Sequence, residues 1–297
     1  MDYNELIENE RLLARKVFGL PLDAPLEINN EGWTSRVYIY NRGEYVIKFP
    51  RTDEARKEYE KEVKASYLFQ NEFVDLPKIT EIGPDVAYIA YKGVIGRTLT
   101  AIERLESGIS ARIGRDLGSF ISELHKKTPE GFNGFSTNDE IEDALDHFRS
   151  AEKFIMENFV REESSIVEKF VTKTVPEAMT KLGEKMVFSH GDLGYWNLIL
   201  QDNGRIGVID MGDADYYDES RDFVGMEDDI MLDTALNVYG DSETLRKKIN
   251  LRQLLLPLME LPYYVSRGDK MNTEAVLRKI RMNITGMNSI MQYRHIK

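Results

Sequence analysis

The chain contains no cysteine among its 297 residues, which excludes disulfide bonds, thiolate catalysis and cysteine-ligated zinc sites. This absence fits a reducing compartment. Long hydrophobic runs are also missing, because no segment approaches the ~18 uninterrupted apolar residues that a membrane-spanning helix needs. The first eight residues show no basic stretch followed by an apolar one, as a secretory signal would. We therefore expect a cytoplasmic protein that does not enter a membrane.

Positive charge is scarce as well. The 39 lysine and arginine residues are outnumbered by 51 aspartate and glutamate residues, and the formal net charge is −12. Proteins that bind nucleic acids cluster basic residues against phosphates, so we expect no nucleic-acid partner. A polycationic small molecule is compatible with this charge, and the alternative is that the acidity only aids solubility. The length fits one large or two modest domains, and we expect a monomer.

Hydrophobic periodicity separates a sheet-rich first part of the chain from a helical second part. Runs rich in β-forming residues predict antiparallel strands at 25–29, 35–40, 44–49 and 86–91, with a hairpin turn at 41–43. Apolar spacing of three and four residues predicts helices at 3–18, 53–70, 110–126, 138–160, 163–182, 243–260 and 273–290. Together they predict an α+β fold with a small lobe at 1–92 and a helical lobe at 93–297.

One segment interrupts the helical part. Short strands expected at 186–189, 198–200 and 206–209 flank the polar sequence His190-Gly191-Asp192-Leu193-Gly194-Tyr195-Trp196-Asn197. This has the spacing of the protein-kinase catalytic loop, H-R-D-x-x-x-x-N, with glycine at the arginine position. Phosphoryl transfer to a hydroxyl needs a carboxylate that accepts the proton and an amide oxygen that binds a metal. We predict Asp192 as the general base, Asn197 as a metal ligand and a structural role for His190.

A second acidic motif, Ile209-Asp210-Met211-Gly212-Asp213, follows eighteen residues after Asp192. An aspartate closing a hydrophobic strand before an x-Gly pair is typical of the D-F-G element of kinases. The two motifs are separated by one expected hairpin, so Asp210 is predicted to face Asn197 across a shared Mg²⁺ that also neutralises the β- and γ-phosphates of a nucleotide.

The first part of the chain contains matching nucleotide-binding features. Lys48 follows Val46-Ile47 on the third expected strand, where kinases carry the lysine that pairs with the α- and β-phosphates. A solvated edge lysine is the alternative interpretation. The next expected helix offers Glu62 as the carboxylate that holds this lysine, with Glu58 one turn earlier as the other candidate.

The glycine-rich loop is degenerate, since Asn30-Glu31-Gly32-Trp33-Thr34-Ser35 stands between the first two strands in place of G-x-G-x-x-G. Backbone amides near Gly32 and the hydroxyls of Thr34 and Ser35 are predicted to contact phosphates. A plain hairpin turn is the alternative. No G-x-x-x-x-G-K-[ST] element occurs, which excludes a P-loop.

These motifs resemble the aminoglycoside phosphotransferase family of the protein-kinase-like fold, over nearly the whole chain. The segments Lys48-Phe49-Pro50-Arg51, Ser122-Glu123-Leu124-His125 and Met226-Glu227-Asp228-Asp229 resemble the 2''-O-phosphotransferases more narrowly. The resemblance implies a two-lobed enzyme that transfers the γ-phosphate of GTP or ATP to an aminoglycoside hydroxyl and confers antibiotic resistance. Residues 1–92 would form the nucleotide-binding lobe.

The same resemblance implies further site residues. Tyr91 and Gly93, at the connector between the lobes, are expected to border the nucleotide, and a bulky aromatic at 91 is associated with GTP use. For Tyr91 the alternative is a place in the core. Asp192, Asp213, Glu227 and Asp228 are expected to bind the polycationic substrate, although charge runs of this kind also form solvated faces.

Three rival functions stay open. The first is a kinase of the same fold that acts on choline, a fructosamine or a macrolide. The second is a nucleotide-binding pseudokinase, which the presence of Asp192, Asn197, Asp210 and Lys48 disfavours. The third is a protein kinase, which is disfavoured because no A-P-E element follows Asp210 and charged helical sequence is expected within about ten residues.

Overall fold

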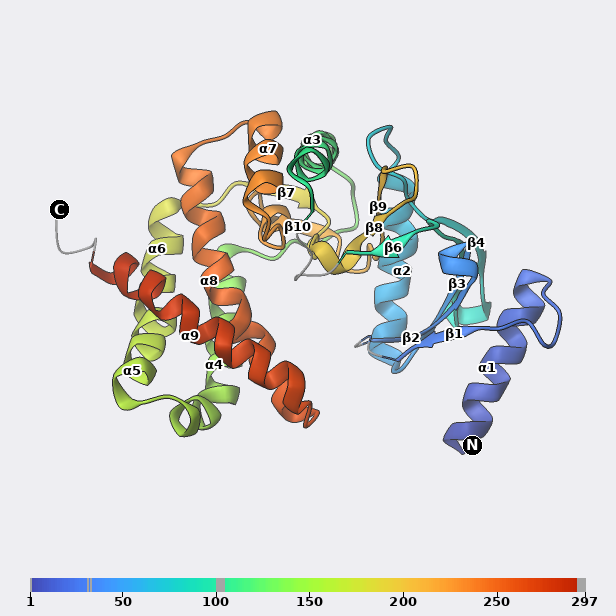
Figure 1. Cartoon of the computed structure of the whole chain (residues 1–297), viewed down its shortest axis with the longest axis horizontal. Helices are drawn as coiled ribbons and strands as arrows, with labels where there is room; N and C mark the ends of the chain where they lie inside the picture. Colours follow the sequence, from blue (N-terminus) through green and yellow to red (C-terminus); the bar gives the residue numbers. More distant parts are fainter. Residues whose placement is uncertain (1, 31, 33, 100–104, 293–297) are drawn as a thin grey trace. The chain divides into compact units, whose positions relative to one another are not determined.

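The structure is a computed structural model that describes residues 2–30, 32, 34–99 and 105–292, and it divides into two compact units (Figure 1). Unit 1 contains Met1–Pro129, Phe188–Ala214 and Gly225–Gly240, and unit 2 contains Glu130–Val187, Asp215–Val224 and Asp241–Lys297. A small antiparallel sheet near the N-terminus and predominantly helical sequence after it confirm the predicted α+β class. The predicted lobe boundary after residue 92 stays a prediction.

A five-stranded antiparallel sheet forms the N-terminal part of unit 1, in the order β1-β2-β3-β5-β4. Its strands are β1 (Glu27–Asn29), β2 (Ser35–Tyr40), β3 (Tyr45–Pro50), β4 (Lys78–Ile82) and β5 (Ile89–Lys92). The β2–β3 hairpin turns through the 3₁₀ segment Asn41–Gly43, as predicted. The sequence did not predict β4, whose residues are mostly exposed at the sheet edge. The predicted start of β5 at Val86 was wrong, because Pro84–Val86 forms a 3₁₀ turn.

Two helices cover opposite faces of this sheet. Helix α1 (Tyr3–Phe18) packs its apolar side with Tyr38, Ile47 and Phe49, whereas α2 (Asp53–Leu68) contributes Tyr59 to a second cluster with Ile89 and Tyr91. Successive side chains of a strand point to opposite faces. The next residue after Ile47 on β3 therefore points to the α2 side of the sheet, where that helix can meet it.

A buried ion pair fastens α1 to β2. The Arg36 guanidinium donates through Nε to Glu10 at 2.9 Å, and the Tyr38 hydroxyl donates to the same carboxylate at 2.8 Å. Glu10 and Arg36 are both buried. Because an unpaired charge is costly away from water, these side chains hold each other in place and fix the position of α1 on the sheet.

Two glycines allow close helix packing elsewhere in unit 1. Helix α3 (Ser107–Leu124) lies against α7 (Asp229–Tyr239), which the sequence analysis did not identify as a helix. A Cβ atom at Gly114 would lie 2.4 Å from the carbonyl oxygen of Met231, and one at Gly118 would lie 2.5 Å from that of Ala235. The four-residue spacing of these glycines puts both on one face of α3, so the two backbones can touch.

Small sheets frame the polar segment of the sequence. A three-stranded sheet has the order β6-β8-β9, formed by β6 (Arg97–Thr98), β8 (Leu198–Leu200) and β9 (Ile206–Val208). A second sheet pairs β7 (Met186–Ser189) with β10 (Asp215–Asp218). The strands β7, β8 and β9 were predicted, whereas β6 and β10 were not. The expected helical sequence soon after Asp210 was wrong, since β10 and a 3₁₀ turn precede α7.

Unit 2 is a helical assembly around one apolar core. Its helices are α4 (Thr137–Asn158), α5 (Arg161–Lys169), α6 (Val175–Leu182), α8 (Glu243–Ser266) and α9 (Lys270–Gln292). Phe148, Phe170, Leu258 and Ile280 are among the buried side chains of the core.

The single helix predicted over 163–182 is divided by a π-helical turn at Phe170–Thr174. Pro176 follows this turn, and proline cannot donate a backbone hydrogen bond to the residue four positions earlier. The regular α-helical ladder is therefore interrupted in this segment, where the spacing of apolar residues gave no sign of a break.

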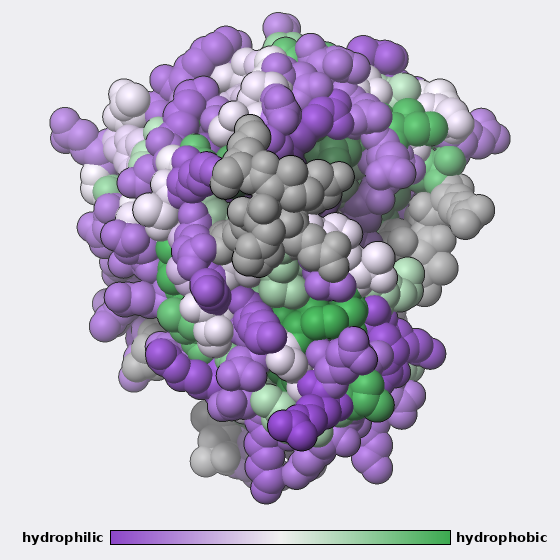
Figure 2. Space-filling view, turned by 90° about the vertical axis from the view of Figure 1, so that its left-hand side faces the viewer, coloured by the Kyte–Doolittle hydropathy of each residue, from purple (hydrophilic) through white to green (hydrophobic). Residues whose placement is uncertain are grey.

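One face of the molecule is mainly hydrophilic. On the face in Figure 2, which is the left-hand side of Figure 1, hydrophilic side chains predominate and hydrophobic ones form small separate areas. In the part of the chain that the structure describes, no helix has the length and apolar character needed to cross a membrane.

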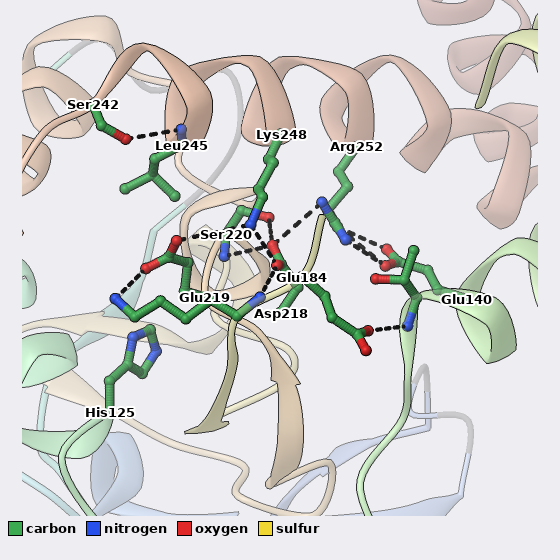
Figure 3. Close-up of polar contacts among 12 residues, drawn as sticks. His125, Glu140, Glu184, Asp218, Glu219, Ser220, Ser242, Leu245, Lys248 and Arg252 are labelled. Atoms are coloured by element: carbon green, nitrogen blue, oxygen red, sulfur yellow. Dashed lines mark hydrogen bonds and ion pairs between the residues drawn. The ribbon is translucent and has the colours of Figure 1, made fainter. Parts of the chain in front are cut away.

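A buried ionic cluster joins the elements of unit 2 (Figure 3). Lys248 and Arg252 project from α8, and Lys248 Nζ donates to Asp218 Oδ2 at 2.8 Å. Arg252 donates to both oxygens of Glu140 on α4, with its shortest contact at 2.7 Å. Asp218 also accepts from Ser220 Oγ at 2.7 Å. All five side chains are buried. Because a buried charge is costly without a partner of opposite charge, each charged member of the cluster depends on the others.

The cluster predicts acid sensitivity. Burial alone would raise the pKa of Asp218, but Arg252, Lys248 and Ser220 outweigh burial and lower it. A folded-state pKa below the unfolded value of about 3.9 stabilises the fold above that pH, and the contribution is lost as pH falls through the folded-state pKa. Asp218→Asn should destabilise the chain by about 3 kcal/mol or more at pH 6, because it leaves Lys248 and Arg252 incompletely paired.

The measurement is urea unfolding between pH 6 and pH 3. The free energy of unfolding of the wild-type chain should fall more steeply below pH 4 than that of Asp218→Asn. Asp146→Asn is the matched control, since Asp146 is 72% exposed and its ion pair is with Arg149 on its own helix. If the free energies of unfolding of the wild type and of Asp218→Asn change in parallel with pH, the stabilising role of the ionised Asp218 carboxylate is contradicted.

Candidate active site

The predicted catalytic loop lies between β7 and β8 in the structure. After β7 ends at Ser189, the chain crosses His190 and Asp192 and forms the 3₁₀ turn Tyr195–Asn197, which leads into β8. His190 is fully buried, and its Nε2 donates to the carbonyl oxygen of Ile209 at 3.1 Å. This contact supports the predicted structural role of His190, because it ties the loop to the residue that precedes Asp210.

Asp192 is held by two side chains of its own loop. Its Oδ2 accepts from the Trp196 indole at 3.0 Å and from Asn197 Nδ2 at 2.9 Å. Asn197 Nδ2 also donates to the Asp192 carbonyl at 2.8 Å. Burial of the carboxyl and the nearby charge of Asp213 raise the pKa of Asp192 to about 6. A carboxylate with a pKa near neutrality is suited to accept a proton during catalysis.

Asn197 and Asp210 are brought to neighbouring positions by the β8–β9 hairpin. The backbone N–H of Ile209 donates to the Asn197 carbonyl at 3.0 Å, so Asn197 lies beside the residue that precedes Asp210. Asp210 has a left-handed backbone with φ of 65°, which is uncommon outside glycine. Strained conformations of this kind concentrate at functional sites. The Asp210 side chain is 51% exposed and therefore accessible to a ligand.

Lys48 lies between two carboxylates from different elements. Its Nζ is 2.9 Å from Glu62 Oε2 on α2 and 2.8 Å from Asp210 Oδ1 after β9. The lysine side chain is only 12% exposed, so it is not the solvated edge residue of the alternative interpretation. Glu58, the other candidate partner, is exposed and forms no such ion pair.

Charge compensation determines the protonation states of this triad. Burial alone would lower the pKa of Lys48, but attraction to Asp210 and Glu62 outweighs it and the pKa is raised. The positive charge of Lys48 lowers the pKa of Asp210. Burial raises the pKa of Glu62, although Lys48 counteracts it. The ammonium of Lys48 is thus kept charged in a site where it can attract phosphate oxygens.

The degenerate loop between β1 and β2 is described only in part, because Glu31 and Trp33 lie outside the described residues. Thr34 is exposed, and its hydroxyl is 3.3 Å from that of Ser35. Ser35 is buried and accepts a hydrogen bond of 2.6 Å from the Tyr59 hydroxyl on α2. The Ser35 hydroxyl therefore anchors the loop to α2, and the phosphate contacts predicted for Gly32, Thr34 and Ser35 stay predictions.

Tyr91 and Gly93 both have structural roles, and for Tyr91 this is the place in the core that was the alternative interpretation. The Tyr91 hydroxyl donates to Glu62 Oε1 at 2.6 Å, and the ring is buried in the cluster beside α2. A Cβ atom at Gly93 would lie 2.2 Å from the Gly43 carbonyl, so only glycine fits against this turn. Tyr91 helps to orient the carboxylate that holds Lys48. The predicted roles of both residues at the nucleotide stay predictions.

The acidic residues predicted to bind substrate differ in their surroundings. Asp213 and Glu227 are exposed. Asp228 instead caps helix α7: its Oδ1 accepts from the Met231 N–H at 2.8 Å and its Oδ2 from the Ser110 hydroxyl at 3.0 Å. Both Asp228 oxygens are thus used in the fold, one of them to cap a helix. Substrate binding by these three residues stays a prediction.

The donor set can be compared with the needs of Mg²⁺. Among the described residues, no group of three or more histidine, aspartate or glutamate side chains could hold a metal ion. Mg²⁺ needs fewer protein ligands, since it is usually bound by one or two carboxylates together with substrate phosphates. Asn197 directs its amide nitrogen to Asp192, which turns the amide oxygen away from Asp192, and Asp210 is accessible. Asn197 and Asp210 therefore fit the needs of a Mg²⁺ site, and their role as metal ligands stays a prediction.

Two contributors to the site were missed in the sequence. Trp196 orients Asp192, although it lies inside the catalytic motif and its indole N–H could have been considered as a donor. Tyr59 binds Ser35 and lies with its ring centroid 5.7 Å from Lys48 Nζ. Its place three residues before Glu62 on the same helix was the available signal.

Comparison with known proteins gives one family and one fold. A family model described as the phosphotransferase enzyme family matches residues 25–240. The structure is similar to a GDP complex of aminoglycoside 2'-phosphotransferase-IIIa, with a TM-score of 0.75, 18% identity, and coverage of 94% of this chain and 99% of that one.

Two further solved structures are similar. The gentamicin complex of APH(2")-IIa matches with a TM-score of 0.67 and 18% identity over 94% of this chain and 96% of that one. A macrolide 2'-phosphotransferase from Brachybacterium faecium matches with a TM-score of 0.63 and 19% identity over 92% and 98%. At these identities the matches show the kinase-like fold, and since the family match spans more than half of the sequence, this chain belongs to the phosphotransferase enzyme family.

Proposed function

We propose that this phosphotransferase moves the γ-phosphate of GTP or ATP to a hydroxyl group of an aminoglycoside, the 2''-hydroxyl, and so confers antibiotic resistance. The observation that carries the proposal is the Lys48 ammonium, held at 2.9 Å by Glu62 and at 2.8 Å by Asp210. Asp192 lies in the same unit with a raised pKa. A fixed cation for phosphates and a carboxylate base are what phosphoryl transfer to an alcohol requires.

In this proposal Lys48 binds the α- and β-phosphates and keeps the γ-phosphate in line with the acceptor. Asp192 orients the acceptor hydroxyl and takes its proton, while Trp196 and Asn197 fix the carboxylate through Oδ2. The acceptor oxygen forms a bond to the γ-phosphorus as the bond from that phosphorus to the bridging oxygen breaks. The nucleoside diphosphate then leaves.

Asn197 and Asp210 would hold Mg²⁺ together with the phosphates. When bound, the ion supplies positive charge against the negative charge of the transferring group. Lys48 contributes to the same neutralisation of negative charge, because its ammonium lies beside Asp210. The observation that favours this pair is the access to Asp210 and the orientation of the Asn197 amide.

The exposed negative charge of the site is the basis for proposing an aminoglycoside as the acceptor. Asp213 and Glu227 expose carboxylates, and Asp213 is close enough to raise the pKa of Asp192. An aminoglycoside carries several ammonium groups that such a region would attract. The solved structure with gentamicin is a neighbour in fold and supports this class of acceptor. Asp228 is a weaker candidate for direct contact, because both of its oxygens are used in the fold.

A macrolide is the second candidate acceptor. The observation that favours it is the structural similarity to macrolide 2'-phosphotransferases at TM-scores of 0.63 and 0.64. A macrolide with a single amino group gains less than a polycation from the exposed carboxylates, so the aminoglycoside is preferred. Choline and fructosamines are the remaining alternatives of the same reaction type.

The first prediction of this proposal is acceptor-dependent turnover. Purified protein with Mg²⁺ and either GTP or ATP should release nucleoside diphosphate much faster with kanamycin or gentamicin than with choline, a macrolide or no acceptor. Phosphorus NMR of the product should identify a phosphate ester on the 2''-hydroxyl. Stimulation by the macrolide or by choline alone would reassign the substrate, and nucleotide binding without turnover on any acceptor would indicate a pseudokinase.

The second prediction concerns the base. Asp192→Asn should lower kcat by about 10²–10⁴-fold, the range for loss of a general base, while nucleotide affinity changes less than about threefold. Steady-state kinetics and calorimetric titration with the nucleotide measure the two quantities. Asp146→Asn is the control and should behave as the wild type. A parallel loss of turnover and nucleotide affinity in Asp192→Asn would show that Asp192 is not the base.

A further inference from the structure

Trp196 contacts a second part of its own loop besides Asp192, the backbone of Gly194. A Cβ atom at Gly194 would lie 2.6 Å from Cε2 of the indole and closer still to two other ring atoms. The backbone of Gly194 is extended, with φ of −137° and ψ of 171°, a conformation that any residue adopts. Glycine is therefore required here by the Trp196 ring, because a side chain would occupy the space in which the ring lies.

The backbone at Gly194 has little room to move away from this ring. Gly194 forms a parallel β-bridge with Gly225. A Cβ atom at Gly225 would lie 2.6 Å from the carbonyl oxygen of Leu193 and closer still to the Cα atom of Gly194. Tyr195 adds an edge-to-face contact to the indole, with the ring centroids 4.8 Å apart. The position of the indole is thus fixed by packed backbone and by a second aromatic ring.

The fixed indole determines which oxygen of Asp192 is available. Its Nε1–H donates to Oδ2 at 3.0 Å, and Asn197 Nδ2 donates to the same oxygen at 2.9 Å. Within the described part of the chain, no group donates a hydrogen bond to Oδ1. Donors stabilise the negative charge on the oxygen that accepts from them, so Oδ2 takes up a proton less readily than Oδ1. Oδ1 is therefore the oxygen that can receive a proton from an acceptor hydroxyl.

The two donors to Oδ2 differ in their other contacts. Asn197 Nδ2 also donates to the Asp192 carbonyl at 2.8 Å, and its amide oxygen is a predicted metal ligand. The indole of Trp196 has a single polar group, the Nε1–H, and this group is used on Asp192. The polar contact of Trp196 thus has one purpose, the orientation of the carboxylate.

We propose that Trp196 is a positioning residue for phosphoryl transfer, which fixes Asp192 so that Oδ1 receives the proton of the acceptor hydroxyl. As this proton moves to Oδ1, the hydroxyl oxygen forms its bond to the γ-phosphorus, and the bridging oxygen leaves with the electron pair of the broken bond. Trp196 acts in this step through Asp192. This inference rests on the proposed function, because it assumes a nucleoside triphosphate and a hydroxyl acceptor.

The kinetic test removes the indole N–H and retains an aromatic ring. With GTP or ATP and kanamycin, Trp196→Phe should lower kcat by about tenfold or more, because a hydrogen bond to a charged group is lost. KM for the nucleotide and for kanamycin should change by less than about twofold, since the lost contact acts on the chemical step. Tyr67→Phe, at an aromatic residue that is 64% exposed, is the control and should match the wild type. An unchanged kcat in Trp196→Phe would overturn the proposal.

A double-mutant cycle separates this role from a general weakening of the loop. Adding Trp196→Phe to Asp192→Asn should lower kcat no further, because the side chain that the indole orients can no longer accept the proton. If the two losses multiply in the double variant, Trp196 acts independently of Asp192 and the proposal is wrong.

Gly194→Ala tests the same placement and leaves the indole intact. The added Cβ atom displaces the ring, so kcat should fall as in Trp196→Phe, and the two changes together should lower kcat little more than either alone. Gly108→Ala is the matched control, because a Cβ atom at Gly108 meets no packed neighbour within 4 Å. Wild-type kcat in Gly194→Ala would contradict the proposed placement. If Gly194→Ala does not fold, Trp196→Phe decides.

A measurement on the chain without substrates tests the hydrogen bond itself. In NMR spectra of ¹⁵N-labelled protein, the indole N–H resonance that disappears in Trp196→Phe should shift in Asp192→Asn, because its acceptor changes from a charged to a neutral group. The same resonance should keep its position in Asp146→Asn. An indole resonance unchanged by Asp192→Asn would also overturn the proposal.

These results distinguish a failure of this inference from a failure of the proposed function. A wild-type chain that phosphorylates an acceptor, with unchanged kcat in Trp196→Phe, refutes only the role of Trp196. A wild-type chain that transfers phosphate to no acceptor refutes the proposed function and, with it, the role of Trp196 in that transfer.

Discussion

The site depends on one positive charge kept away from water. The Lys48 ammonium is 12% exposed and is compensated by Glu62 from a helix and Asp210 from a loop. A buried cation requires such partners, because its transfer from water is otherwise too costly. The sheet, α2 and the β8–β9 hairpin must therefore meet at one point, and Tyr91 adds a hydrogen bond that keeps Glu62 in place. Fold and site are coupled through this ion pair.

Several of these features followed from local sequence rules. The Val46-Ile47-Lys48 motif on the third expected strand indicated Lys48. Motif spacing indicated that Asp192, Asn197 and Asp210 share a loop region, as they do in the structure. The sequence favoured Glu62 and left Glu58 as the alternative, because the two lie four residues apart on one helix. Only the position of α2 on the sheet brings Glu62 to Lys48 and leaves Glu58 exposed.

Other features depend on contacts that no local pattern contains. Arg51 reaches carbonyl groups up to twenty-one residues away, and a strand-end arginine normally reads as a solvated residue. Strand β4 was missed because an edge strand with mostly exposed residues shows little apolar alternation. Helix α7 was hidden by its acidic start, which resembled a solvated charge run until Asp228 proved to be its cap. In each case tertiary structure supplied the missing information.

The cap at Asp228 has a consequence for the evolution of substrate choice. Two neighbouring carboxylates that look equivalent in the sequence are under different constraints, since Asp228 joins the start of α7 to Ser110 of α3 whereas Glu227 is exposed. Replacing Asp228 would loosen the N-terminus of α7 and its contact with α3. A descendant of this protein that adapts to a new acceptor would therefore have to keep a capping side chain at residue 228 to preserve the start of α7.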